Sequence, residues 1–165
     1  MVKMGFSLQR LEEAEKNLAG EIPDWEFEQV KLQTRKIWND KLSRIEIKGG
    51  SPQQRELFYT SLYHSFFIPT VSSDFNDDSI RYGSIYPWDT YRCKQPLLTI
   101  LDPGPTNNMV LSILDRYDRT GWLPTGNMLA NHNIAVILDS YVKGISDFDT
   151  EKAYEAMRKS IMQPP

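Results

Sequence analysis

Cysteine and histidine are scarce in this chain. Its 165 residues include one cysteine, Cys93, and two histidines, His64 and His132. A lone cysteine cannot form an internal disulfide, and two histidines leave little room for a zinc site made by the protein alone. We therefore expect neither a disulfide framework nor a zinc centre, and we interpret Cys93 as a small buried hydrophobe.

The chain also lacks an excess of positive charge and long apolar runs. A formal net charge of -3 creates no basic field, so we expect no nucleic-acid partner. No stretch of about 18 apolar residues occurs, so we expect no membrane span. The first six residues become polar too soon for a signal peptide, although a piece of a longer protein would have lost its signal.

What is present is an ordinary soluble composition with many aromatic residues. Hydrophobic residues make up 40% and charged residues 25%, which is typical of globular proteins. Aromatic residues reach 12%, which suits a sugar-binding site and suits a well-filled core equally well.

Apolar residues at helical spacing predict helices joined by short turns, and therefore a mainly α fold of antiparallel helix hairpins. Ser51, followed by Pro52 and Gln54, is the clearest helix start, because it combines a cap, a proline at the first position and a capping box. Further expected caps are Ser7, Asp24 and Asp149.

Other segments break the helical pattern. Residues 44–48 alternate polar and apolar, which predicts a short strand. Residues 69–87 carry the turn residues of a long loop. Residues 88–101 predict one helix, bent at Pro96.

The run at residues 84–92, SIYPWDTYR, has the chemistry of a carbohydrate site. Trp88 supplies a flat apolar ring, Asp89 a carboxylate that accepts hydrogen bonds from vicinal hydroxyls, and Arg92 a fixed donor. A plainer interpretation is also open. Asp89 would lie near a positive helix end, and Asp89 with Arg92 would form an i,i+3 ion pair worth about 0.2–0.5 kcal/mol.

Several segments resemble glycoside hydrolase family 92, the α-mannosidases. Residues 58–64 (FYTSLYH) resemble the family's FYTALYH, and residues 88–97 resemble its WDTFR…PL. Residues 117–124 (YDRTGWLP) resemble its YDQSGWLP, and residues 131–149 resemble its GNH…DAYLKG…DFD. The opening, with residues 3–7, 17–18 and 38–39, resembles the linker that enters the catalytic domain. The loop before Trp88 and the stretch between Pro124 and Asn131 are shorter than the usual family pattern.

The resemblance implies exo-acting, calcium-dependent, inverting hydrolysis of α-linked mannose in glycans. It implies that residues 1–50 are inter-domain linker helices with a short strand, and that residues 51–165 are the first part of a six-hairpin α/α barrel. Inversion needs a carboxylic acid and a carboxylate base about 6.5–9.5 Å apart. In the family both residues, and most calcium ligands, lie in later segments, so we assign no catalytic or metal residue and expect this piece alone to be inactive.

For the sugar, the resemblance implies binding by Trp88, Asp89, Arg92 and His132, with a mannose-containing glycan as partner and a periplasmic or secreted parent enzyme. An incomplete barrel would leave apolar helix faces unpaired, so we expect exposed hydrophobic patches and self-association. Two alternatives stay open: an α/α-barrel glycosidase of other sugar specificity, and a non-catalytic helical binding or scaffold domain.

The two histidines and one acidic loop have further interpretations. His132 at a predicted helix start would otherwise be a capping or hydrogen-bonded histidine. His64, inside an aromatic helix, is expected to be a hydrogen-bonded core residue. The acidic loop is expected to be solvated rather than to bind calcium, because it lacks the glycine and the final glutamate of an EF-hand loop; it contains Asp74, Asn76, Asp77 and Asp78.

Overall fold

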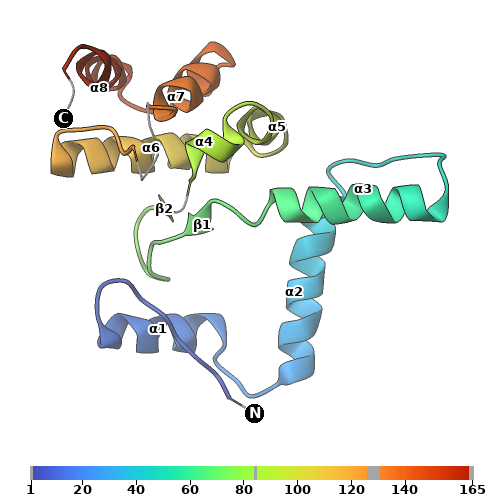
Figure 1. The fold of residues 1–165 in the computed structure, drawn as a ribbon. Helices are drawn as coiled ribbons and strands as arrows, with labels where there is room; N and C mark the ends of the chain where they lie inside the picture. Colours follow the sequence, from blue (N-terminus) through green and yellow to red (C-terminus); the bar gives the residue numbers. More distant parts are fainter. Residues whose placement is uncertain (1, 84, 126–130, 164–165) are drawn as a thin grey trace. The chain divides into compact units, whose positions relative to one another are not determined.

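The computed structural model describes residues 2–83, 85–125 and 131–163. The chain is mainly helical, as the sequence predicts, and divides into two compact units (Figure 1). The first unit comprises Met1–Ile68 and Ser72–Asp78, and the second comprises Pro69–Val71 and Ser79–Pro165. The predicted division at residue 50 between a linker and a barrel stays a prediction.

The described residues of the first unit form three helices: α1 (Leu11–Glu21), α2 (Phe27–Leu42) and α3 (Pro52–Ser65). Helix α3 begins where the sequence predicts. The backbone N–H of Gln54 donates to Ser51 Oγ at 3.2 Å, and the N–H of Ser51 donates to Gln54 Oε1 at 2.8 Å. Both halves of the capping box are therefore present, and they use two N–H groups that the helix itself leaves unpaired.

Two other predicted caps in this unit are wrong. Helix α1 begins after Arg10, and α2 begins after Glu26. The hydroxyl of Ser7 accepts from the N–H of Gln9 at 3.0 Å and donates to Asp74 at 3.1 Å, so it serves a loop rather than a helix. Asp24 lies before the start of α2 and does not cap it.

The predicted strand at residues 44–48 is also wrong. A strand is stabilised by a neighbouring strand, and the carbonyl of Ile45 instead accepts a hydrogen bond from the hydroxyl of Tyr59 at 3.1 Å. The short strands that do form, β1 (Thr70–Val71) and β2 (Tyr82–Gly83), lie in the segment predicted as a loop. They pair antiparallel, with Thr70 opposite Gly83 and Val71 opposite Tyr82.

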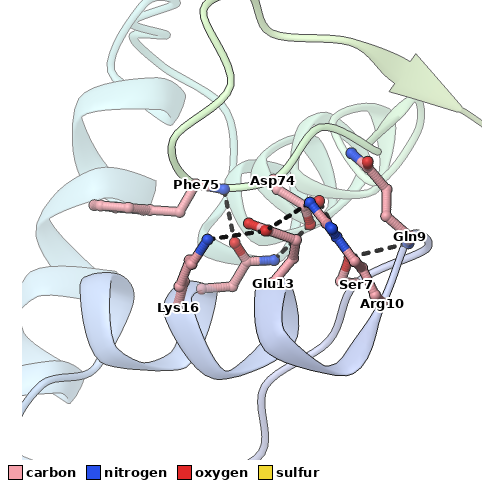
Figure 2. A network of polar contacts seen from close by, with 8 residues as sticks. Ser7, Gln9, Arg10, Glu13, Lys16, Asp74 and Phe75 are labelled. Atoms are coloured by element: carbon pink, nitrogen blue, oxygen red, sulfur yellow. Dashed lines mark hydrogen bonds and ion pairs between the residues drawn. The ribbon is translucent and has the colours of Figure 1, made fainter.

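A buried polar network holds the acidic loop against α1 (Figure 2). The side-chain amide of Asn17 donates to Asp74 Oδ1 and to the carbonyl of Phe6, each at 2.7 Å. The N–H of Phe75 donates back to Asn17 Oδ1 at 2.8 Å. Asp74 is 9% exposed and Asn17 is 8% exposed. The prediction that this loop is solvated is therefore wrong for Asp74.

An aromatic cluster packs α2 against α3. The ring centroid of Tyr63 lies 4.4 Å from that of Trp38 and 4.6 Å from that of Phe67. His64 lies at the edge of this cluster, 5.3 Å from Phe67. Its side chain is exposed, so the prediction of a core histidine is wrong; the residues that face inward on α3 are its apolar neighbours, such as the buried Leu62.

The second unit contains five helices in its described part: α4 (Pro87–Thr90), α5 (Lys94–Leu101), α6 (Pro103–Thr120), α7 (Asn133–Val142) and α8 (Thr150–Met162). Its core is contributed by α6, α7, α8 and the turn after α6 (Figure 1). The buried residues of this core are Val110, Ile113, Leu114, Leu123, Val136, Ile137, Ala153 and Ala156.

The start of α8 is confirmed, because Asp149 Oδ1 accepts from the N–H of Lys152 at 2.9 Å. The single helix predicted for residues 88–101 is instead two helices, interrupted at residues 91–93. Pro96 lies after this interruption, within α5. It is the third residue of that helix, where a backbone N–H would have no partner within the helix anyway.

Large apolar side chains remain exposed on both units, as predicted for a chain with unpaired helix faces. On α7 and α8 these include Tyr141, Val142, Tyr154, Ile161 and Met162, which are between 52% and 70% exposed. Whether these faces drive self-association stays a prediction. Within the described residues, no helix is both long and apolar enough to cross a membrane.

Candidate functional site

A tight turn introduces the predicted sugar-binding residues. Tyr86 has φ 45°, a left-handed conformation that costs a residue other than glycine about 1–3 kcal/mol. The buried hydroxyl of Thr90 stabilises the turn, since it lies 2.9 Å from the carbonyl oxygen of Tyr86, and the side-chain amide of Gln95 donates to it at 3.2 Å. Pro87 then opens α4 at a position that suits proline. The turn leaves Trp88 48% exposed, with Asp89 exposed beside it.

His132 lies against Trp88, although the two residues are far apart in the sequence. The ring centroids are 4.8 Å apart and the planes meet at 84°, which is an edge-to-face contact. The ring of Tyr91 lies 4.8 Å from the same imidazole on a tilted plane. His132 occupies the N-cap position of α7, as its interpretation as a capping residue requires, but its side chain makes no capping hydrogen bond.

Asn133, the residue that follows His132, anchors this segment of the chain. This residue is 2% exposed, and its side-chain amide donates to the carbonyl of Pro124. The contact ties the turn after α6 to the first residue of α7. Asn133 therefore fixes the backbone at the start of α7, while the printed contacts of the His132 imidazole are with the rings of Trp88 and Tyr91.

Arg92 does not pair with Asp89, so the plainer interpretation of these two residues as an i,i+3 ion pair is wrong. Its Nε donates to the hydroxyl oxygen of Tyr91 at 2.7 Å, and its guanidinium lies 5.4 Å from the centroid of that ring. This hydrogen bond is the main cause that raises the pKa of Arg92 above its usual value. Within the described chain the carboxylate of Asp89 has no hydrogen-bond or ion-pair partner.

The structure thus brings Trp88 and His132 into direct contact in one aromatic cluster with Tyr91, and Asp89 is exposed next to Trp88. The fourth predicted residue, Arg92, is present but turned toward Tyr91. Tyr91 was not predicted as a site residue. The available signal for Tyr91 was its position between Asp89 and Arg92 in an aromatic run. Spacing along the chain does not show, however, that its ring faces His132.

Cys93 is exposed, so its prediction as a buried hydrophobe is wrong. It lies in the interruption between α4 and α5, where the helical pattern that suggested burial does not hold. The next residue, Lys94, is half-buried, and burial lowers the pKa of its ammonium group to about 8 from an ordinary value of 10.5.

The lowered pKa of Lys94 predicts that stability rises with pH between about 8 and 10. In this window the unfolded chain binds more protons than the folded chain, so the free energy of unfolding increases as pH increases. The penalty for the buried charge is full below pH 8 and disappears above the ordinary pKa. Urea unfolding followed by circular dichroism at pH 7.5, 8.5 and 9.5 would measure this slope.

The matched variants for this measurement are Lys94→Met, which should flatten the slope, and Lys143→Met in the same unit, which should keep it. An equal slope in wild type and Lys94→Met would contradict the assignment. At higher pH, Tyr82 contributes in the opposite direction, because burial, with a smaller contribution from Asp102, raises its pKa and stability is lost as pH rises through that pKa.

The described residues do not fit a calcium site. No group of three or more His, Cys, Asp or Glu side chains gathers in that part of the chain. In the acidic loop, Asp74 accepts hydrogen bonds from Asn17 and Ser7, and Asp77 accepts from the N–H of Asp74 at 2.9 Å. Those oxygens serve the protein, and we assign no chemical step to calcium here. Two parts of the predicted motifs, Ser84 and most of the short stretch after Pro124, lie outside the described residues.

Comparison with known proteins gives a consistent result. A family model described as the glycosyl hydrolase family 92 catalytic domain matches residues 13–165. Among solved structures, a family GH92 inverting mannosidase from Bacteroides thetaiotaomicron VPI-5482 is 29% identical with a TM-score of 0.87, and the match covers 92% of this chain and 24% of that chain. No curated protein matches the sequence significantly.

A GH92 α-mannosidase from Bacteroides thetaiotaomicron is 25% identical with a TM-score of 0.88, and the match covers 94% of this chain and 24% of that chain. That enzyme has also been solved in complex with mannoimidazole. These matches confirm the mainly helical hairpin fold expected of part of an α/α barrel. The chain spans about a quarter of the length of these solved mannosidases.

Proposed function

Because the chain belongs to glycosyl hydrolase family 92, we propose that it forms part of an enzyme that removes terminal α-linked mannose from glycans by an inverting, calcium-dependent mechanism. The family match and the likeness to two solved mannosidases support the reaction class. We place the catalytic acid, the catalytic base and the calcium ligands outside these residues, and the enzyme in the periplasm or outside the cell, where glycans are encountered.

In this proposal the exposed face of Trp88 packs on the apolar face of the terminal mannose. An edge-to-face neighbour such as His132 covers at most one side of the indole, and the side chain is 48% exposed. The neighbouring Asp89 carboxylate accepts hydrogen bonds from vicinal hydroxyls. Such bonds to an ionised acceptor are stronger than those between neutral groups.

The observation that carries the proposal is the free carboxylate of Asp89 beside an exposed indole. Asp89 is exposed and its carboxylate accepts no hydrogen bond within the described chain, so both oxygens are available to sugar hydroxyls. Arg92 and His132 complete the candidate site. His132 contacts the rings of Trp88 and Tyr91, and Arg92 donates a hydrogen bond to the hydroxyl of Tyr91.

The direct test is release of mannose from an α-1,2-linked mannobiose by the longest protein that contains this chain, with and without a calcium chelator. The 165-residue chain is assayed in parallel. Release by the longer protein alone, abolished by the chelator, supports the proposal in full. Release by the short chain would place a catalytic pair within it, and inactivity of both would favour a scaffold domain instead.

A further inference from the structure

Tyr91 lies at the centre of the candidate site without belonging to the set of predicted sugar-binding residues. Its ring packs against the buried core cluster and contacts His132, and its hydroxyl accepts a hydrogen bond from Arg92. We propose that Tyr91 is a positioning residue that orients both His132 and Arg92, an inference that rests on the proposed function.

The imidazole of His132 is held by ring contacts rather than by hydrogen bonds to the described residues. His132 is only partly buried, and its side chain does not cap α7. Its ring contacts within the described chain are Trp88 on one side and Tyr91 on another, each at 4.8 Å between centroids. Trp88 is itself exposed, whereas Tyr91 packs on the core. The rigid member of the three is therefore Tyr91, and it determines where the imidazole lies.

The guanidinium of Arg92 is held by the hydroxyl of Tyr91. Spacing along the helix would allow Arg92 to pair with Asp89, and such a pair would use the carboxylate that the sugar needs. The hydroxyl of Tyr91 offers Arg92 an alternative acceptor at 2.7 Å, in a hydrogen bond to a charged donor. By holding Arg92 on its own side, Tyr91 leaves Asp89 without a cation and ready to accept sugar hydroxyls.

Tyr91→Phe separates the two contacts of Tyr91. It keeps the ring that contacts His132 and removes the hydroxyl that accepts a hydrogen bond from Arg92. The variant loses one hydroxyl group and keeps the ring that packs against the core, so it is expected to fold. Tyr91→Leu removes the ring as well. Tyr141→Phe is the matched control, since Tyr141 is 52% exposed on α7. Loss of its hydroxyl should leave the positions of His132 and Arg92 unchanged.

Side-chain NMR of the 165-residue chain tests the positioning without any assay of activity. The chain has two histidines, so the ring signals of His132 can be assigned with His132→Gln, and His64 serves as an internal reference. Tyr91→Leu should shift the His132 signals and leave those of His64 unchanged, whereas Tyr91→Phe should shift only the Nε–H signal of Arg92. Unchanged His132 signals in a folded Tyr91→Leu chain, or an unchanged Arg92 signal in Tyr91→Phe, would overturn the inference.

Kinetics of the longest protein that contains this chain test the consequence for binding. Tyr91→Phe should raise KM for an α-mannoside about three- to tenfold, as expected for losing one hydrogen bond, with kcat nearly unchanged. If the hydroxyl acts through Arg92, the double variant Tyr91→Phe/Arg92→Gln should match Arg92→Gln alone. Effects that multiply would show that the hydroxyl acts independently of Arg92 and would overturn the inference.

Failure of the proposed function gives a different pattern. In that case Asp89→Ala would leave mannose release unchanged, while the NMR signals of His132 and Arg92 would still report whether Tyr91 positions them. The two ideas can therefore be rejected separately.

Discussion

Replacing Asp89 with alanine in the longest protein that contains this chain is expected to lower kcat/KM for α-mannosides by about 100-fold or more. The substitution removes an acceptor that would bind two sugar hydroxyls, and hydrogen bonds to a charged group contribute about 1.5–3 kcal/mol each. The fold should be unaffected, because the carboxylate has no partner within the described chain. Steady-state kinetics with a chromogenic α-mannoside would measure the change.

The control for Asp89→Ala is Asp118→Ala in the same unit. Asp118 is also a partly exposed aspartate, but it forms a surface ion pair with Lys152 at 2.9 Å. Such a pair contributes about 0–1 kcal/mol, so activity should stay near that of wild type. Trp88→Ala is a second probe of the sugar site and should cost about tenfold through the lost ring contact. An Asp89→Ala enzyme with unchanged catalytic efficiency would contradict the proposed sugar-binding role.

The second large effect is expected in the first unit, where Asn17→Ala should lower the free energy of unfolding by about 3 kcal/mol. The substitution removes two donated hydrogen bonds and one accepted bond, and it leaves the buried Asp74 carboxylate with fewer donors. Each buried polar group that loses its partner costs about 1–3 kcal/mol, and a charged group costs more. Asn17 lies on α1, and its side chain bonds to Asp74 and to the N–H of Phe75 in the acidic loop.

Urea unfolding combined with amide hydrogen exchange would measure this loss. The N–H of Phe75 reports directly, because its acceptor is the Asn17 side chain. Asn39→Ala is the matched control, since Asn39 is an exposed residue within α2 and gains the same helix propensity. Unchanged protection of the Phe75 amide, with an unfolding midpoint equal to that of wild type, would show that the network does not stabilise the unit.

Several parts of this molecule could be predicted from local sequence. The starts of α3 and α8 depend on one capping side chain and an N–H group three residues away, so the relevant partners are adjacent in the sequence. The mainly helical fold follows from apolar periodicity in the same way. Predictions failed where a local signal had a competing partner far along the chain, as for Ser7, which contacts Asp74, and for residues 44–48, where Ile45 contacts Tyr59.

For the candidate site, the residue types and their order follow from the sequence alone: an indole, a carboxylate and a guanidinium within one short run, and a histidine at the start of a later helix. Which of these residues meet depends on how the helices pack. Trp88 and His132 come together through the packing of α7 on the core, and Arg92 selects the Tyr91 hydroxyl over the Asp89 carboxylate. Such choices lie between partners of similar energy, so the surrounding packing decides them rather than spacing along the chain.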